Sequence, residues 1–425
     1  MPFHLPFCLL VCLLLGGAAA WAQKPSAAAP ANPAPAPVRL GIDLLAGENF
    51  AALRALTPGR KPRLGLVANQ SSLDSAGRRT IDVLAQAKSL RLVAIFAPEH
   101  GLTARKDTLE IGAERDAATG TAIHGVYGAT EASRRPKEAD LDGLDAIVFD
   151  LQDAGVRWYT YETTLGYFLE ACARRGIALV VLDRPNPLGG ERVEGPVSAA
   201  SIRSFTNYFP LPVRHGMTLG ELAELFNSSP QGEGPARLIV VRMRGWHRTM
   251  LFAQTGLRWT PPSPNLRSPE EALLYPALSM IEGTNVSVGR GTETPFEVLG
   301  APWIDGRRLT EALRARRISG IRVETAEFTP VSSNFAGKLC HGVRLQLTDG
   351  ARLDSPRLGL ELAAALHRLY PEKFEMAKMA TLLAEPGTLE RLQKGEEPEH
   401  IAARWQEAIA AFLRQRSGYL FDEYK

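Results

Sequence analysis

The sequence predicts an α/β protein: a Rossmann-like, doubly wound and mostly parallel sheet followed by a second, smaller α+β domain. Three observations support this prediction. Runs that are apolar on both faces recur between residues 64 and 243, as expected of strands buried inside a parallel sheet. Stretches of helical length separate these runs, which indicates repeated βα units. The alternation stops near residue 246, where Pro-rich and Gly-rich segments precede a mixed pattern.

The first domain is predicted to alternate strands and helices in chain order. The strands are expected at residues 64–69, 92–97, 145–150, 177–182 and 238–243. The helices are expected at residues 77–87, 163–175 and 218–227. Gly176 suits the C-terminal end of the second helix, and Thr218 with Glu221 has the pattern of a capping box. The polar loop over residues 102–121 is long enough to suggest a functional segment.

The second domain is predicted to be a mixture of strands and helices. Strands are expected at residues 321–328 and 343–348, and a helix at residues 355–370. Helical sequence resumes at Pro398, since proline is tolerated in the first turn of a helix.

Length and composition agree with this division. At 425 residues the chain exceeds one ordinary core, so we expect domains over residues 38–245 and 246–425. A hydrophobic content of 45% and a charged content of 22% are typical of a globular protein. The 49 basic and 46 acidic residues give a net charge of +3, which offers no support for a nucleic-acid partner.

The N-terminus has the pattern of an exported protein. Residues 1–22 are predicted to be a signal peptide, with an apolar run from Phe7 to Ala20 and a small-x-small pattern before Gln23. The first residues contain no Lys or Arg, and an uncleaved anchor is the alternative, although the run is short for a span. Residues 23–37 are rich in Ala and Pro and are expected to form a tether. We therefore expect a periplasmic or secreted protein without a membrane span after cleavage.

Cysteine usage does not predict a disulfide scaffold. Two of the four cysteines would leave with the signal peptide, so the mature chain keeps Cys172 and Cys340. Cys172 falls in an amphipathic helix and is most simply a small buried hydrophobe. A single bridge between the two remains open in an oxidising compartment.

Polar side chains gather where three of the predicted strands end. These side chains are Glu99 and His100; Asp150, Gln152 and Asp153; and Asp183, Arg184 and Asn186. Because ligands bind outside the carboxyl ends of parallel strands, the three groups are expected to meet at one rim. Asp183 is equally well explained as a cap or turn residue, and His100 as a histidine that holds its loop. Glu99, between Pro and His, has no such structural explanation.

Aromatic residues follow the second polar group. Trp158 and Tyr159 precede a helix and are predicted to line a pocket, where an apolar face with a polar edge suits a sugar ring. Tyr167, inside the helix, is predicted to be core.

The sequence does not support dinucleotide binding, a serine hydrolase or a metal site. The glycines around Arg290 lack the setting of a dinucleotide fingerprint, and no Gly-x-Ser-x-Gly elbow is present. His100, His124 and His215 are not spaced like metal ligands on a helix. We therefore expect no cofactor and no metal.

The chain resembles the NamZ-like exo-β-N-acetylmuramidases, a family of secreted bacterial glycoside hydrolases. The matching segments are residues 97–101, 149–161, 183–187, 214–218, 262–265 and 282–285. The resemblance implies a Rossmann-like catalytic domain with a smaller auxiliary domain. It also implies release of N-acetylmuramic acid from the non-reducing ends of peptidoglycan fragments, and it identifies Glu99 as the catalytic residue.

The chemistry of glycoside cleavage suggests roles for the acidic residues. Such cleavage generally needs one protonated and one ionised carboxyl group, so Glu99 is predicted to be the general acid, with His100 beside it. Asp150, Asp153 and Glu282 are the candidates for the second role, which the 2-acetamido group of the substrate would otherwise take.

The remaining site residues are predicted to bind the muramyl saccharide. Muramic acid carries a lactyl carboxylate, which Arg157, Arg184 or Arg290 would grip, unless each is a structural ion-pair partner. The other candidates are Asn69, Gln152, Trp158, Tyr159, Asp183, Asn186, His215, Asn265, Glu282, Thr284 and Asn285. The competing hypothesis is a non-catalytic protein that binds peptidoglycan fragments in the same groove. A metal-dependent hydrolase, which would lose activity on chelation, is a third possibility.

Overall fold

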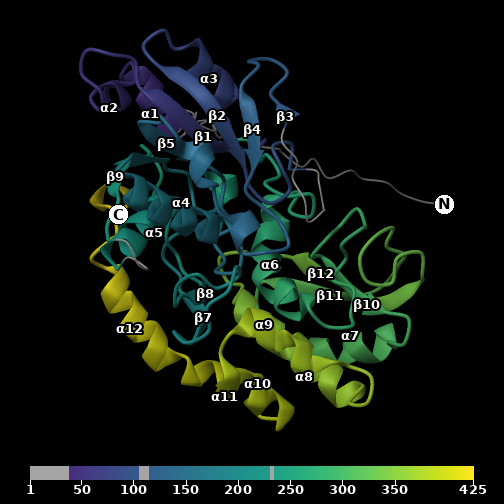
Figure 1. Cartoon of the computed structure of the whole chain (residues 1–425). Helices are drawn as coiled ribbons and strands as arrows, with labels where there is room; N and C mark the ends of the chain where they lie inside the picture. Colours follow the sequence, from purple (N-terminus) through teal and green to yellow (C-terminus); the bar gives the residue numbers. More distant parts are fainter. Residues whose placement is uncertain (1–37, 105–113, 230–233) are drawn as a thin grey trace, which may run out of the picture. The chain divides into compact units, whose positions relative to one another are not determined.

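A seven-stranded sheet dominates the first half of the chain in the computed structural model, which describes residues 38–104, 114–229 and 234–425 (Figure 1). The strand order is β3-β4-β2-β1-β5-β6-β9, and every pair is parallel except β3 with β4. The strands are β1 (Arg63–Ala68), β2 (Arg91–Ala97), β3 (Glu114–Arg115), β4 (Ala122–Gly125), β5 (Ala146–Asp150), β6 (Ala178–Leu182) and β9 (Arg237–Val241). The predicted fold class is confirmed. The predicted signal peptide and tether lie outside the described residues.

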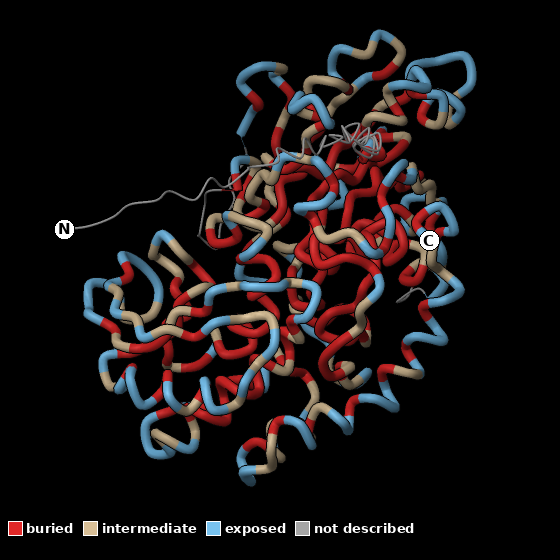
Figure 2. Tube along the Cα trace, turned by 180° about the vertical axis from the view of Figure 1, so that it is seen from behind, coloured by how far each residue is buried: buried red, intermediate tan, exposed pale blue. Residues whose placement is uncertain are grey.

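Helices cover both faces of this sheet because side chains alternate along each strand. Leu66 of β1 packs into a core that includes residues of α1 (Gly41–Gly47) and α3 (Thr80–Gln86). Its neighbour Val67 packs on the opposite face, in the core that contains α4 (Tyr161–Arg175) and α5 (Leu219–Ser228). Figure 2 shows that the trace through the sheet is buried along most of its length, which explains why the strands are apolar on both faces.

Gly65 shows how closely the face towards α4 is packed. A Cβ atom at this position would lie 2.7 Å from Ile147 Cδ1 and 2.8 Å from the Phe96 ring. Only glycine allows the neighbouring strands to fill this space with larger side chains.

The order of the strands places the polar segments at one edge of the sheet. β1 pairs with β2 on one side and with β5 on the other, so Val67 is opposite both Phe96 and Phe149. The segments after these three strands therefore leave the sheet at the same level. Such a point in the strand order is where α/β proteins place their ligands.

The second half of the chain builds a smaller antiparallel sheet of order β10-β12-β11. Its strands are β10 (Val298–Ala301), β11 (Ile321–Phe328) and β12 (Cys340–Leu347). The helices of this half are α6 (Pro269–Glu282), α7 (Gly306–Ala315), α8 (Ser355–Leu369), α9 (Ala380–Leu383), α10 (Pro386–Gln393), α11 (Pro398–Arg404) and α12 (Gln406–Arg416). One hydrophobic core contains residues of both halves.

Three smaller elements, α2, β7 and β8, lie in the first half of the chain. The helix α2 (Ala51–Arg54) follows α1, and the strands β7 (Glu194–Val197) and β8 (Pro212–Arg214) pair with each other. The chain end returns to the first sheet: the Tyr424 hydroxyl accepts a hydrogen bond from Met243 N at 2.8 Å and donates one to Asp183 Oδ2 at 2.8 Å. The predicted division between residues 245 and 246 stays a prediction.

Most predicted elements are present, with shifted ends. α5 has the predicted cap, in which Thr218 Oγ1 accepts from Glu221 N. α3 begins at Thr80, three residues after its predicted start, because Gly77 has a φ of +82° and belongs to a turn. The 14-residue helix α6 was not predicted, since a Pro-rich approach and Pro276 inside it hide its pattern.

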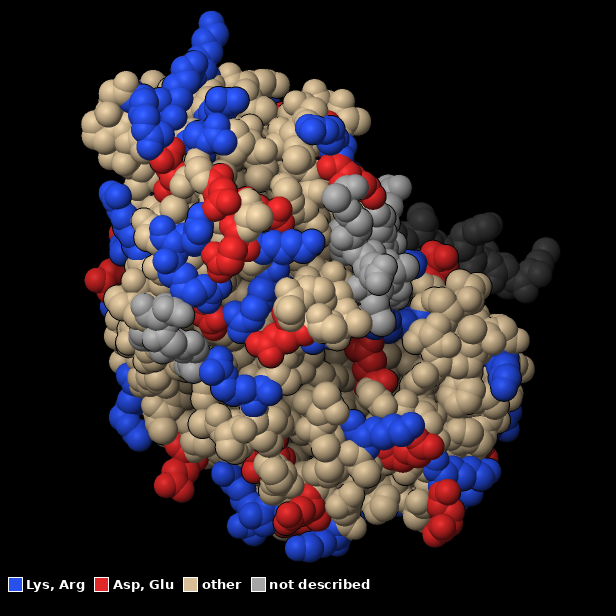
Figure 3. Space-filling model, viewed as in Figure 1, with Lys and Arg blue, Asp and Glu red and all other residues tan. Residues whose placement is uncertain are grey.

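Two surface properties follow from the composition. Figure 3 shows Lys and Arg interspersed with Asp and Glu over the face seen in Figure 1, as a net charge of +3 suggests. Within residues 38–104, 114–229 and 234–425, no helix is both long and apolar enough to cross a membrane.

Candidate active site

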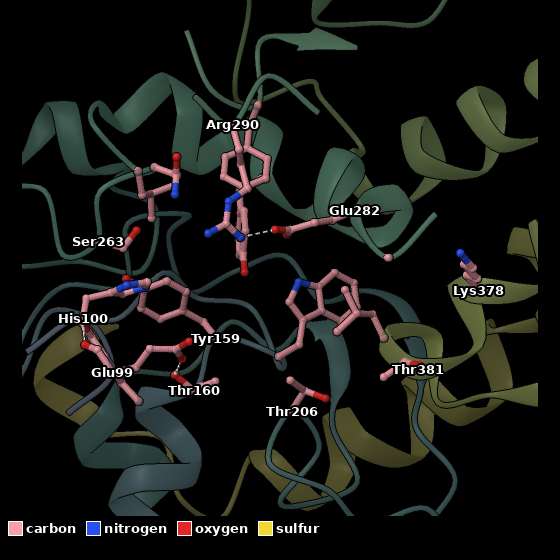
Figure 4. Close-up of a pocket in the computed structure, with 18 residues that line it drawn as sticks. Glu99, His100, Tyr159, Thr160, Thr206, Ser263, Glu282, Arg290, Lys378 and Thr381 are labelled. Atoms are coloured by element: carbon pink, nitrogen blue, oxygen red, sulfur yellow. Dashed lines mark hydrogen bonds and ion pairs between the residues drawn. The ribbon is translucent and has the colours of Figure 1, made fainter. Parts of the chain in front are cut away.

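A cavity of about 470 Å³ opens where the segments after β2 and β5 meet elements of the second half. Residues from both halves of the chain line it (Figure 4). They are Glu99, His100, Trp158, Tyr159, Thr160, Tyr161, Thr206, Ser263, Asn265, Leu266, Tyr275, Glu282, Gly283, Arg290, Phe296, Lys378, Thr381 and Leu382. A space of this size and mixed lining suits a sugar residue.

Glu99 lies on the turn that ends β2. Pro98 stops the strand ladder, and Gly101 N donates to Pro98 O at 2.9 Å to close the turn. His100, inside it, has a φ of +72°, a left-handed conformation that is uncommon for a residue other than glycine and is often found at functional sites. The Glu99 carboxylate is half-buried and accepts a hydrogen bond from Thr160 Oγ1 at 2.5 Å. The turn thus fixes a carboxyl group at the cavity wall.

Aromatic rings form a second part of the wall. The Tyr159 ring contacts those of Tyr161 and Tyr275 edge to face, with centroids 4.9 Å and 6.0 Å apart. Trp158 Nε1 donates to Ser279 Oγ of α6 at 2.8 Å, which holds the indole against the second half of the chain. These rings offer the apolar faces that a sugar requires.

Tyr161 links three segments beneath the cavity. Its hydroxyl accepts from Asn69 Nδ2, which follows β1, at 2.7 Å and donates to Pro262 O at 2.7 Å. Burial and the nearby Glu99 carboxylate raise the pKa of Tyr161, so its hydroxyl keeps its proton at neutral pH. Asn69, predicted to bind substrate, instead positions a residue that lines the cavity.

Arg290 lies across the cavity from Glu99 and Thr160 (Figure 4). It forms an ion pair with Glu282, at the end of α6. In the amide orientation that satisfies its hydrogen bonds, the Asn265 oxygen accepts from Arg290 Nε and Nη2, each at 3.2 Å. The guanidinium group is therefore held in a fixed position.

The acidic and basic groups at the ends of β5 and β6 do not reach the cavity. Asp150 is fully buried and pairs with Arg184 Nε at 2.5 Å, and it also accepts from Thr80 Oγ1 at 2.5 Å. Asp183 accepts from Thr218 Oγ1 and from Tyr424, each at 2.8 Å, and burial raises its pKa to about 7. These groups join the sheet to the helices and to the end of the chain.

Asp153 and His215 form another buried pair outside the cavity lining. Asp153 Oδ2 accepts from Gly155 N at 2.8 Å and lies 3.8 Å from His215 Nε2. Burial raises the pKa of Asp153 to about 7. Burial, together with Arg416 and Arg214, lowers the pKa of His215 to about 3, so the imidazole is neutral at pH 7.

Arg157 is buried and does not line the cavity. Its guanidinium group donates to four carbonyl oxygens, those of Pro196, Leu211, Leu382 and Leu383, at 2.7 to 3.1 Å. Burial lowers its pKa to about 10, which leaves it charged at pH 7. It ties β7 and β8 to α9, a structural role.

Four further predicted residues also lie outside the lining. Gln152 donates to Asp153 O and Pro185 O, each at 2.9 Å. The remaining contacts are Asn186 Nδ2 to Met217 O at 2.9 Å and Asn285 Nδ2 to Lys373 O at 2.7 Å. Thr284 is buried.

The structure therefore divides the predicted site residues in two. Those that it brings together around the cavity are Glu99, His100, Trp158, Tyr159, Asn265, Glu282 and Arg290. Sequence reasoning missed several lining residues: Thr160, Tyr161 and Ser263 stand inside the matching segments, where a search for hydroxyl groups would have found them. Tyr275, Phe296, Lys378 and Thr381 carry no local signal, because only the packing of the second half brings them here.

Among the residues that the structure describes, no group of three or more His, Cys, Asp or Glu could hold a metal ion. Cys172 and Cys340 are both buried free thiols.

Comparison with known families places the chain among the glycosidases. It matches the family model described as exo-β-N-acetylmuramidase NamZ, N-terminal, over residues 64–270, and the C-terminal model over residues 273–421. These matches cover most of the chain, which therefore belongs to the NamZ exo-β-N-acetylmuramidase family.

Individual relatives agree with this assignment. The chain is 38% identical to the peptidoglycan β-N-acetylmuramidase NamZ of Bacillus subtilis (strain 168) over 389 residues, 90% of this chain and 91% of the relative. It also resembles the crystal structures of two DUF1343 family proteins from Bacteroides fragilis NCTC 9343. Their identities are 30% and 28% with TM-scores of 0.82 and 0.73, and each comparison covers 91% of this chain and 99% of the other.

Proposed function

We propose that this protein is an exo-acting glycoside hydrolase that releases N-acetylmuramic acid from the non-reducing ends of peptidoglycan fragments. Membership of the family supports the reaction class and the substrate class. The observation that carries the proposal is the position of Glu99, on a left-handed turn in the wall of a sugar-sized cavity, facing aromatic rings and a fixed guanidinium group.

Glu99 acts as the general acid. Its carboxyl group donates a proton to the glycosidic oxygen as the bond from that oxygen to the anomeric carbon breaks, so the leaving sugar departs as a neutral alcohol. Water then supplies the hydroxyl group of the released sugar and the proton that restores Glu99. Thr160 Oγ1, 2.5 Å from Glu99 Oε2, orients the carboxyl group for this transfer.

Glu282 is the protein carboxylate best placed for the second role. Of the three candidates, only Glu282 lines the cavity, whereas Asp150 and Asp153 are buried in other contacts. A carboxylate here stabilises the positive charge that develops on the sugar ring, or activates the attacking water. Alternatively, the 2-acetamido group of the substrate attacks the anomeric carbon as an internal nucleophile, and no protein nucleophile is needed.

Arg290 is the candidate for binding the lactyl carboxylate. Of the three arginines considered, Arg157 and Arg184 are committed to buried carbonyl and carboxylate partners, while Arg290 lines the cavity. Glu282 and Asn265 fix the plane of its guanidinium group. A guanidinium group held in this way recognises a carboxylate with defined geometry.

A chromogenic N-acetylmuramide and a saccharide with a muramyl residue at its non-reducing end test this function. We expect release of the chromophore and of free N-acetylmuramic acid, and little reaction with the matching N-acetylglucosaminide. Saturable binding without release of free sugar would instead identify a peptidoglycan-binding protein.

We further propose that the chain acts outside the cytoplasm, in the periplasm or after secretion. The pattern of residues 1–22 supports this, and it lies outside the described residues. N-terminal sequencing of protein recovered from the native compartment is expected to begin at Gln23; a start at Met1 would contradict cleavage.

A further inference from the structure

One side of the helix α6 faces the cavity that contains Glu99. Tyr275 and Glu282 both line this cavity, and they lie seven residues apart, two turns along the same side of the helix. Between them, Ser279 holds the Trp158 indole through a hydrogen bond of 2.8 Å. The reaction proposed above uses Glu282 but gives no role to Tyr275.

Two edge-to-face contacts hold the ring of Tyr275. Its centroid lies 4.8 Å from that of Phe296 and 6.0 Å from that of Tyr159, with the ring planes 81° and 89° apart. The side chain is buried, and both neighbouring rings also line the cavity. Because the ring is held on two sides, its hydroxyl group has a fixed position.

The hydroxyl group of Tyr275 is an unused hydrogen-bond donor. Among the residues that the structure describes it has no hydrogen-bond partner, whereas the Tyr161 hydroxyl is committed to Asn69 and Pro262. Burial, followed by the nearby carboxylates, raises the pKa of Tyr275, so its hydroxyl keeps the proton at neutral pH. A buried donor without a partner is costly, and a ligand with an acceptor at this point removes that cost.

Tyr275 lies between the two charged sides of the cavity. Glu99 and Arg290 are on opposite sides (Figure 4). Towards Glu99, the Tyr275 ring contacts Tyr159, which directly precedes the hydrogen-bond partner of Glu99. Towards Arg290, the helix of Tyr275 ends at Glu282, which pairs with that arginine. The negative charges of Glu282 and Glu99 both act on the Tyr275 hydroxyl, in agreement with a place between them.

We propose that the Tyr275 hydroxyl group donates a hydrogen bond to the carbonyl oxygen of the 2-acetamido group and thereby selects sugars that carry this group. The inference rests on the proposed function, which places the glycosidic oxygen on C1 at Glu99 and the lactyl group on C3 at Arg290. In a pyranose ring C2 is bonded to both C1 and C3, so the acetamido group lies between these two contacts. Its amide oxygen is the acceptor that the donor between them requires.

The test measures binding by calorimetry in the Glu99→Gln background. The two ligands are methyl β-N-acetylmuramide and its 2-deoxy analogue, which keeps the lactyl carboxylate but has no acceptor at C2. Tyr275→Phe keeps the ring and is expected to raise Kd about 10-fold for the N-acetyl ligand, because the bound carbonyl loses its donor. Kd for the 2-deoxy ligand is expected to change less than about 2-fold. Tyr419→Phe, whose hydroxyl accepts from Ser228 at 2.7 Å outside the cavity lining, is the matched control and leaves both values unchanged.

An equal rise in Kd for both ligands, or no rise for either, in a Tyr275→Phe variant with the melting temperature of its parent would overturn the inference. The selective loss does not depend on turnover. If the wild type hydrolyses no muramide, the proposed function fails, while a loss confined to the N-acetyl ligand still supports the contact with Tyr275. If muramides are hydrolysed and the two ligands respond equally, the proposed function stands and this contact is rejected.

Discussion

The strands β2 and β5 lie on either side of β1, and each is followed or ended by a residue with a carboxyl group. The two carboxyl groups differ in their burial and in their partners. Glu99, after β2, is half-buried at a cavity wall and has a hydroxyl partner, Thr160. Asp150, the last residue of β5, is fully buried and pairs with Arg184. Both positions are strand ends in one sheet, and the sequence predicts a catalytic role for each: Glu99 as the general acid and Asp150 as one of three candidates for the second role.

Burial and partners separate the two carboxyl groups. A charge that loses its water must gain a cation and hydrogen bonds, and such a group is then occupied by its partners. Asp150 meets this requirement through Arg184 and Thr80, which makes it a structural anchor. Glu99 keeps access to the cavity and can exchange its proton with a ligand.

The largest expected effect is a loss of turnover, without a loss of stability, when Glu99 is replaced. Glu99→Gln is expected to lower kcat on a muramyl saccharide by about 10³-fold, because it removes the acidic proton and keeps the shape of the side chain. The melting temperature is expected to stay within a few degrees of the wild type, as differential scanning calorimetry would show. The control is Glu407→Gln on the exposed face of α12, which should change neither value. Wild-type turnover in Glu99→Gln would remove this residue from the mechanism.

At the end of β5, where Asp150 pairs with Arg184, we expect a substitution to lower stability. Arg184→Met leaves Asp150 buried without its cation and should lower the free energy of unfolding by about 3–5 kcal/mol. The matched control is Arg242→Met, which breaks an exposed pair with Glu423 and should cost about 1 kcal/mol or less. Urea denaturation measures both. If Arg184→Met is as stable as the control, the anchoring role of the Asp150 pair is wrong.

A smaller effect is expected at Arg290. Arg290→Met should raise KM for the chromogenic N-acetylmuramide by about 10-fold, because a charge-assisted hydrogen bond to the lactyl carboxylate is lost. The effect on a glucosaminide, which lacks that carboxylate, should be weaker. Steady-state kinetics on the two substrates measure this. An equal rise in KM on both would show that Arg290 only holds Glu282 in place and does not bind the lactyl carboxylate.

The last expected effect concerns the pH dependence of stability and Asp153. Its pKa of about 7 in the folded protein exceeds the value of about 3.9 in the unfolded chain, so between these values only the folded state holds the proton. Raising the pH from 5 to 7 should therefore destabilise the wild type relative to Asp153→Asn by on the order of 1 kcal/mol per pH unit. Thermal unfolding across this range measures the difference. A difference that does not change with pH would show that Asp153 is ionised throughout.

The local sequence pattern was sufficient to predict the fold of the first half of the chain. Strands apolar on both faces, such as residues 146–149 of β5, follow from burial between two helical layers, and Thr218 caps α5 through a local hydrogen bond. The helix α6 was not predicted, because Pro276 lies inside it. Its hydrophobic residues are buried on several sides, so its sequence shows no amphipathic period.

The site was predictable only in part, because the sequence cannot show which polar strand end becomes buried. Asp150 and Asp183 were grouped with Glu99, yet their burial depends on Arg184 and on Tyr424, which is 241 residues from Asp183. Tyr275 and Lys378 reach the cavity only through the packing of the second half, which no local pattern encodes.

The loss of kcat/KM in Glu99→Gln, compared between substrates with different leaving groups, tests the central claim most directly. A saccharide needs a proton on its departing oxygen, whereas a dinitrophenyl group leaves as a stable anion without one. The account predicts a loss of about 10³-fold in kcat/KM for the saccharide and a loss of less than about 10-fold for the dinitrophenyl muramide. Equal losses on both substrates would contradict Glu99 as the general acid.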